Sequence, residues 1–305
     1  MIIFIFLFLA SYFSLKVWEY LARKIGIVGK DLHKISKPEI PEAGGIPIFL
    51  LFFLINYPYI LKYPYLLSSF LGFLIGLTDD LLRPRGLPWK AKFLLSFIPV
   101  IVVLIPTFLA NFGFSFLSIL FFLILLVLGV GWTNAVNTLA GFNGVEICSI
   151  LPILIYLAFC ANSYEEKQIL AKLIIILIPF LFENWCPAKI FPGDSFTYGA
   201  GALISAYFVT YLDFRGGIAF LLPYLLNGYP ILFFLFYSFL GKKVKLEKHD
   251  WIIKGNGVIC PTKKEKLLEF IAFLISKRRK ACREDELAFG VFLIQMLILL
   301  ILLAL

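Results

Sequence analysis

Apolar runs close to 20 residues long recur along this chain, and short polar segments separate them. A helix needs about 20 apolar residues to cross the hydrocarbon core of a bilayer. Apolar residues make up 61% of the 305 residues and charged residues only 15%, which is typical of a polytopic membrane protein. We therefore predict an all-α fold with about ten transmembrane helices. The predicted spans cover residues 1–21, 44–61, 64–82, 91–110, 114–133, 146–162, 169–185, 197–212, 216–239 and 287–305.

The distribution of Lys and Arg predicts the side of the membrane on which each connecting segment lies. Segments that follow odd-numbered spans hold 23 of the 28 Lys and Arg residues, and they stay richer when the long last segment is left out. Cytoplasmic loops carry such an excess. Both termini are then expected outside. The predicted cytoplasmic loops cover about residues 22–43, 79–92, 134–145, 186–196 and 240–286.

The net charge of +9 falls mostly on this predicted cytoplasmic face. Such a face attracts anionic head groups and phosphorylated substrates, so we expect membrane lipid rather than nucleic acid as a partner. The five cysteines show no C-x-x-C or Cys/His spacing, which argues against a zinc site or a disulfide framework. We find no internal repeat, so residues 1–305 are predicted to form a single integral membrane domain.

The last predicted cytoplasmic segment contains two shorter structural signals. Residues 251–260, WIIKGNGVIC, form two β-branched runs around Gly-Asn-Gly, which predicts a small β-hairpin. Thr262 and Glu265 make a capping-box pattern before the apolar run LLEFIAFLI, which is too short to span a membrane. Because the basic string KRRK follows at 277–280, we expect an interfacial helix; a helix packed only on protein is the alternative.

Two adjacent carboxylates, Asp79 and Asp80, end the third predicted span. Burying such a pair at a membrane boundary is costly unless a cation or a proton offsets the charge. Lys90 and Lys92 follow closely, and carboxylates beside basic residues suit phosphoryl transfer. A solvated helix end is the alternative interpretation of the pair.

The third predicted cytoplasmic loop has no Lys or Arg but carries Asn134, Asn137 and Asn143 with Gly141 and Gly144. Asn134 and Asn137 are three residues apart, which places them on one helical face. An Asn carbonyl is a hard oxygen ligand suited to magnesium, and a Gly-containing turn lets the backbone approach a base or a phosphate. Helix capping and turn formation are the alternative roles.

In the fourth predicted loop, Asp194 stands between Gly193 and Ser195, and Phe191 comes just before. Asp194 could serve only as the N-cap of the next helix. The alternative is that Asp194 is a metal ligand and that the ring of Phe191 is a platform on which a flat base stacks.

Four strings connect these loops: GIVGKDLHKISKPEIPEAGG, the Asp-Asp loop ending in WKAK, NAVNTLAGFNGVE and FPGDSFTYGAGA. Together they resemble the polyprenyl-phosphate N-acetylhexosamine-1-phosphate transferases of glycosyltransferase family 4. The resemblance covers about residues 26–250 and is strongest to the eukaryotic and archaeal UDP-N-acetylglucosamine:dolichyl-phosphate N-acetylglucosamine-1-phosphotransferases. The His-rich signature that bacterial members carry in their last cytoplasmic loop is missing, and only His249 lies in that loop.

The resemblance implies transfer of a sugar 1-phosphate from a UDP-sugar to a dolichyl or polyprenyl phosphate. The expected cofactor is Mg²⁺, and Mn²⁺ is its expected substitute. The products would be a lipid-diphosphate-sugar and UMP, in the first membrane step of glycan assembly. N-acetylglucosamine is the favoured sugar, and a related N-acetylated sugar is the alternative. We favour direct attack over an enzyme-bound intermediate, because a lipid phosphate is already mostly anionic at neutral pH.

The resemblance also assigns roles to individual residues. Asn137 and Asp194 match the magnesium ligands, and Asp79 and Asp80 match the catalytic acidic pair. Lys92 matches the phosphate-contacting lysine after that pair, with three extra residues between them. The residues assigned to substrate binding are Glu42, Asn134, Gly141, Asn143 and Phe191. Of these, Gly141, Asn143 and Phe191 match the uracil-reading groups. In the last loop, KKVKLEKHDW stands where the family has a His/Arg-rich string, which makes Lys245, Lys248 and His249 the candidates for substrate contact.

A transporter or flippase for an anionic sugar or lipid is the alternative function. Transporters place ionisable groups near the membrane midplane, whereas the polar groups here are predicted at one face. The enzyme would be an integral protein of an archaeal cell membrane with a cytoplasmic active site. Whether it forms a homodimer stays open.

Overall fold

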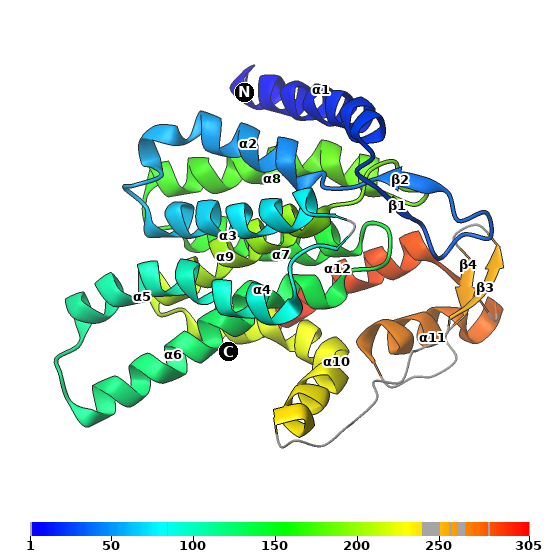
Figure 1. Ribbon diagram of the computed structural model, residues 1–305. Coiled ribbons are helices and arrows are strands. Elements are labelled where there is room, and N and C mark those ends of the chain that lie inside the picture. Colours follow the sequence, from blue (N-terminus) through cyan, green and yellow to red (C-terminus); the bar gives the residue numbers. More distant parts are fainter. Residues whose placement is uncertain are drawn as a thin grey trace.

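Every predicted span falls on a helix in the computed structural model (Figure 1). The structure describes residues 2–83, 85–239, 251–255, 258–260, 266–279 and 281–304. The helices over the spans are α1 (Ile2–Ile25), α2 (Gly45–Ile55), α3 (Pro64–Leu81), α4 (Trp89–Leu95), α5 (Phe97–Asn111), α6 (Phe116–Ala135), α7 (Val145–Cys160), α8 (Tyr164–Asn184), α9 (Gly193–Tyr211), α10 (Phe214–Phe239) and α12 (Glu284–Ala304). Two 3₁₀ helices, η1 (Tyr57–Tyr59) and η2 (Val136–Leu139), follow α2 and α6.

Two of the predicted spans are interrupted. The span 44–61 divides into α2 and η1, because the Asn56 amide donates to the carbonyl of Phe52 at 2.9 Å and Pro58 has no N–H to continue the helix. The span 91–110 divides into α4 and α5 at Ser96. Pro99 explains this second break, since it cannot donate to a carbonyl one turn earlier.

Among the described residues, three helical segments are long and apolar enough to cross a membrane: Ile2–Ile25, Trp89–Asn111 and Phe116–Leu139. Large apolar side chains on them stay exposed, including Phe6 of α1 and Val127 of α6. Apolar surface of this extent is stable against lipid but not against water. The fold is therefore that of a mostly helical integral membrane protein.

The loops of the bundle gather at its two ends (Figure 1). One end holds the loops after α1, α3, α6 and α8, together with both small sheets, and the other holds the loops after α2 and α5. The loops predicted from the Lys and Arg distribution to share one side of the membrane therefore share one end of the fold.

Helix α9 lies at the centre of the bundle, and residues 194–209 are all buried. Its small residues allow the backbones of neighbouring helices to come close, as is common in membrane helices. The Ser69 hydroxyl of α3 donates to the carbonyl of Gly199 at 2.9 Å, and the Ser205 hydroxyl of α9 donates to the carbonyl of Gly129 at 2.8 Å. These hydrogen bonds hold α9 against α3 and α6.

Gly76 allows α3 to approach the first turn of α9. A Cβ atom at this position would lie 2.1 Å from the carbonyl oxygen of Asp194. Backbone atoms of a helix cannot move aside as a flexible side chain can. The glycine therefore sets the distance between the end of α3 and the start of α9.

Two small antiparallel sheets lie beside the loops. Strands β1 (Val28–Lys30) and β2 (Glu39–Pro41) pair with each other, and β3 (Ile252–Gly255), β4 (Val258–Cys260) and β5 (Cys282–Arg283) form a sheet in that order. The pairing of β3 with β4 confirms the predicted hairpin. The sequence did not predict the other three strands, because two or three residues are too few to show an alternating pattern.

The predicted short helix is present as α11 (Leu267–Arg279). It buries Leu268 and Ile271 and leaves Phe270 and Leu274 exposed. Its position at a membrane surface stays a prediction. Thr262, Glu265 and Lys280 lie outside the described residues.

Replacing Gly76 with Ala should destabilise the protein, because the added methyl group overlaps the α9 backbone; overpacking of this kind costs about 1–3 kcal/mol. Gly131→Ala is the matched control, since a Cβ atom there meets nothing within 4 Å. Thermal unfolding in detergent should show a lower midpoint for Gly76→Ala and little change for Gly131→Ala. Equal midpoints would contradict the close contact between α3 and α9.

Candidate active site

Hydrogen bonds join the loops at one end of the bundle into a continuous surface. The N–H of Phe191 donates to the carbonyl of Pro41 at 2.7 Å, and the Phe191 carbonyl accepts from the N–H of Gly44 at 2.9 Å. The N–H of Gly144 donates to Oδ1 of Asn184 at 2.9 Å. Backbone hydrogen bonds therefore join the loops before α2 and α9, and the Asn184 side chain ties the loop before α7 to the end of α8.

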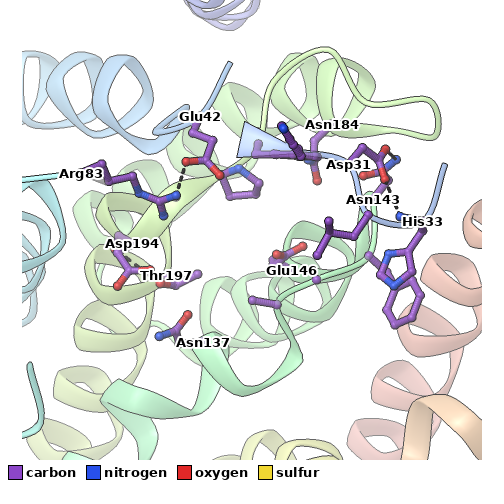
Figure 2. A pocket seen from close by; sticks show the side chains of 18 residues that line it. Asp31, His33, Glu42, Arg83, Asn137, Asn143, Glu146, Asn184, Asp194 and Thr197 are labelled. Atoms are coloured by element: carbon purple, nitrogen blue, oxygen red, sulfur yellow. Dashed lines mark hydrogen bonds and ion pairs between the residues drawn. The ribbon is translucent and has the colours of Figure 1, made fainter. Parts of the chain in front are cut away.

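A cavity of about 290 Å³ lies between these loops. Figure 2 shows Arg83 and Asp194 at one end of it and Asp31 and Asn143 at the other, with Glu146 between them. We call these the Asp194 end and the Asn143 end. Their side chains differ enough that each end suits a different part of a ligand.

Three carboxylates meet at the Asp194 end. Oxygen atoms of Asp79, Asp80 and Asp194 lie within 4.8 Å of one another. Asp80 is fully buried, and its Oδ1 and Oδ2 accept the N–H groups of Asp194 at 3.0 Å and Ser195 at 2.9 Å. Asp80 therefore satisfies the N-terminus of α9, where a negative charge is stabilised by the helix dipole.

Gly193 makes this helix start possible. Its φ of +74° is unfavourable for other residues, and a Cβ atom would lie 2.7 Å from Oδ2 of Asp80 and 2.7 Å from Cα of Ala43. The glycine lets the chain turn into α9 directly against the buried carboxylate. Asp194 follows in the first turn and lines the cavity.

Lys92 lies between two of the carboxylates. Its Nζ is 2.7 Å from Oδ2 of Asp194 and 3.4 Å from Oδ1 of Asp79. Burial raises the pKa of the Asp194 carboxyl, and the nearby Lys92 ammonium opposes this shift. The Arg83 guanidinium adds a second positive charge 3.8 Å from Oδ1 of Asp80, but it also pairs with Glu42. These four carboxylates and two cations leave excess negative charge, which a divalent cation would offset.

Arg83 connects this cavity to a second one. Its guanidinium forms an ion pair with Glu42, and it lines both spaces. Burial raises the pKa of the Glu42 carboxyl, and Arg83 opposes the shift. The second cavity has a volume of about 500 Å³, and Asp79 and Lys92 also line it. Two spaces therefore meet at one group of acids and bases.

The side chains at the Asp194 end fit a magnesium ion. Asn137 of η2 lines the same cavity as Asp194, and Asp79 borders it. Carboxylate and amide oxygens are hard ligands of the kind that Mg²⁺ takes. Asp80 contributes its charge but has committed both oxygens to backbone N–H groups.

The Asn143 end is built from buried polar and aromatic groups. Nδ2 of Asn143 donates to Oδ2 of Asp31 at 3.1 Å. Glu146 is buried, and its Oε2 has no hydrogen-bond partner among the described residues. The His33 ring stacks on Phe142 with centroids 4.2 Å apart. Burial lowers the pKa of His33, which makes its imidazole neutral near pH 7.

Asp31, His33 and Glu284 form another group of close ligand atoms, within 4.8 Å of one another. Here Lys34 already supplies a positive charge, because its Nζ is 2.6 Å from Oε2 of Glu284 and 3.4 Å from Oδ2 of Asp31. The group therefore fits a buried ion-pair network that ties the first loop to α12.

The structure brings most of the predicted site residues together. Asp79, Asp80 and Lys92 meet beside the cavity at the Asp194 end. Those that line the cavity itself are Glu42, Asn137, Gly141, Asn143, Phe191 and Asp194.

Asn134 does not line the cavity. Its Nδ2 donates to Oγ of Ser96 at 2.9 Å and to the carbonyl of Val130 at 2.8 Å, and its Oδ1 accepts from the hydroxyl of Tyr198 at 3.2 Å. Its amide is thus used between helices. Lys245, Lys248 and His249 lie outside the described residues.

Several residues of the site were not predicted from the sequence. Arg83 lies three residues after Asp80, and Glu146 is the only charged residue in the span 146–162, so both had a local signal. Asp31 and Asn184 had none, because they reach the cavity through contacts between distant segments.

Comparisons with known proteins agree with this geometry. The sequence model of glycosyl transferase family 4 matches residues 63–212. The chain is 32% identical over 209 residues to a protein of Saccharolobus solfataricus with the provisional name UDP-N-acetylglucosamine–dolichyl-phosphate N-acetylglucosaminephosphotransferase, covering 61% of this chain and 63% of that protein. It is 26% identical over 249 residues to the protein of that name in Schizosaccharomyces pombe, covering 60% and 55%.

A phospho-N-acetylmuramoyl-pentapeptide-transferase of Fervidobacterium nodosum is 31% identical over 208 residues, covering 64% of this chain and 65% of that protein. The chain thus spans less than two thirds of the length of each of these three relatives. The range that matches the family includes Asp79, Asp80, Asn137 and Asp194, which meet at one end of the cavity. Residues 63–212 of the chain thus form a glycosyl transferase family 4 domain.

Proposed function

We propose that this protein transfers N-acetylglucosamine 1-phosphate from UDP-N-acetylglucosamine to a dolichyl or polyprenyl phosphate and releases UMP. Two of the relatives described above are named for this transfer, and the third is named for transfer of another phospho-sugar. The observation that carries the proposal is that two cavities share Arg83, and that Lys92 of the second cavity lies 2.7 Å from Asp194 of the first. A reaction between two phosphorylated substrates needs two such spaces and one group of charges between them.

The charges of the first cavity favour one orientation of the UDP-sugar. Asp31 lines the Asn143 end and Glu146 lies between the two ends, and their carboxylates would repel a diphosphate placed there. Arg83 and Lys92 lie at the Asp194 end, where a cation held by the carboxylates would add further positive charge. The diphosphate therefore lies at the Asp194 end, and the neutral base lies at the Asn143 end.

The acceptor phosphate then belongs in the second cavity, beside Asp79, Arg85 and Lys92. An oxygen of this phosphate attacks the β-phosphorus of the UDP-sugar, the bond from that phosphorus to the bridging oxygen breaks, and the bridging oxygen leaves with UMP. Lys92 and Arg83 stabilise the negative charge that spreads over the phosphoryl oxygens.

The two adjacent carboxylates have different roles in this proposal. Asp79 lines the second cavity, so its carboxylate orients the acceptor phosphate and accepts a proton from it when one is present. Asp80 instead positions Asp194, because its two oxygens hold the start of α9.

Asp194 and Asn137, with Asp79 beside them, are the residues that would hold Mg²⁺. When bound, the ion would supply charge that screens the diphosphate and stabilises the leaving UMP. Mn²⁺ is the expected substitute, because it also takes oxygen ligands.

We further propose that all ten predicted ranges cross the membrane with the site on the cytoplasmic face. The Lys and Arg excess in the loops at the site end supports this orientation. A lipid phosphate in the membrane surface and a UDP-sugar from the cytoplasm could then reach the same point.

Purified full-length protein should release UMP only when UDP-N-acetylglucosamine, a polyprenyl phosphate and Mg²⁺ are all present. Removal of the metal with EDTA should stop release, and added Mg²⁺ should restore it. A panel of UDP-sugars in the same assay identifies the sugar. Release that persists without the lipid phosphate would contradict the transfer, and the absence of UMP together with transport into vesicles would favour a transporter.

Asp194→Asn should reduce turnover about 100-fold or more, because a neutral amide removes a charge on which the phosphoryl transfer depends. Asp213→Asn makes the same chemical change in the loop between α9 and α10, where Asp213 accepts from the Tyr156 hydroxyl at 2.8 Å. Steady-state rates and melting midpoints of both variants should be compared. Near-normal turnover by a folded Asp194→Asn variant would exclude Asp194 as a metal ligand.

A further inference from the structure

Asn143 has a fixed amide orientation in the cavity. It is only 4% exposed, and its Nδ2 lies 3.1 Å from Oδ2 of Asp31, which is also 4% exposed. If the amide were turned over, its oxygen would face a carboxylate oxygen, and two acceptors would meet without a proton between them. The buried carboxylate therefore forces the N–H₂ group toward itself.

Asp31 is itself held in place from two sides. Its Oδ1 accepts the N–H of His33 at 3.1 Å, and the ammonium of Lys34 lies 3.4 Å from its Oδ2. Lys34 is in turn 2.6 Å from Glu284 of α12. The positive charge beside Asp31 keeps this side chain an acceptor of hydrogen bonds.

The other buried amide at this end is already satisfied. Asn184 accepts the N–H of Gly144 at 2.9 Å and donates to the carbonyl of Ile190 at 2.9 Å. Asn143 commits its Nδ2 to Asp31, which leaves its Oδ1 for a ligand in the cavity that it lines. The nearby unpartnered oxygen of Glu146 makes this part of the cavity richer in acceptors.

We propose that Asp31 is a positioning residue that makes the site select uridine over cytidine nucleotides, by turning the Asn143 oxygen toward the base. This rests on the proposed function, which places the base at the Asn143 end. Uracil carries an N–H at position 3 and can donate to this oxygen. Cytosine carries a bare nitrogen there, which would face the oxygen as a second acceptor.

The test measures binding of UMP and of CMP to the purified full-length chain, so that it does not depend on turnover. Wild type should prefer UMP. Asp31→Asn keeps the size of the side chain, but its amide can face Asn143 with either an oxygen or an N–H₂ group. The Asn143 amide is then free to turn over, and the preference for UMP should fall about tenfold or more.

Glu165→Gln is the matched control, because it also turns a carboxylate into an amide, in the first turn of α8 where Glu165 pairs with Lys62. This variant should keep the full preference for UMP. A purely structural role of Asp31 would weaken UMP and CMP binding alike and leave their ratio unchanged, and that result would overturn the proposal.

Asn143→Ala tests the same idea if Asp31→Asn does not fold. Removing the amide should abolish the preference for UMP. A preference that survives Asn143→Ala would overturn the proposal. Equal binding of UMP and CMP by the wild-type protein would also overturn the proposal, but it would leave the transferase function intact. Failure of the wild-type protein to release UMP from UDP-sugar and lipid phosphate would instead contradict the transferase function.

Discussion

Two backbone N–H groups at the start of α9 donate to one buried carboxylate, Asp80, and the arrangement of the site depends on this contact. A fully buried charge is tolerated only where hydrogen bonds and opposite charge compensate it, and a helix N-terminus supplies both. Gly76 and Gly193 remove the side chains that would keep the two segments apart. Asp194 is consequently held in a fixed position against the end of α3.

The site combines this rigid end with a cavity whose two halves differ in charge. Basic residues and carboxylates that can share a cation lie at one end, and buried acceptors lie at the other. Because like charges repel strongly where water is largely excluded, such a division orients a ligand that has one charged part and one neutral part. Binding and chemistry are thereby assigned to different ends of the same space.

The helices could be predicted from the sequence because each apolar run is itself the signal, whereas the side chains of the site depend on contacts that leave no local pattern. Asp31 and Asn143 are 112 residues apart, and only the fold reveals their hydrogen bond. Asn134 and Asn137 show a different limit. Their spacing places them on one face of an α-helix, but α6 ends at Ala135 and continues as the 3₁₀ helix η2. Asn137 of η2 lines the cavity, whereas Asn134 of α6 does not.

The buried pair between Lys34 and Glu284 joins residues that are 250 positions apart. At ordinary rates of synthesis the ribosome needs on the order of 10–50 s to make the chain between them. During that time Lys34 and Asp31 lack the carboxylate of α12, and a buried charge without its partner is unstable. The Asn143 end of the cavity is thus completed only after α12 has been made, so this part of the site is among the last to assemble.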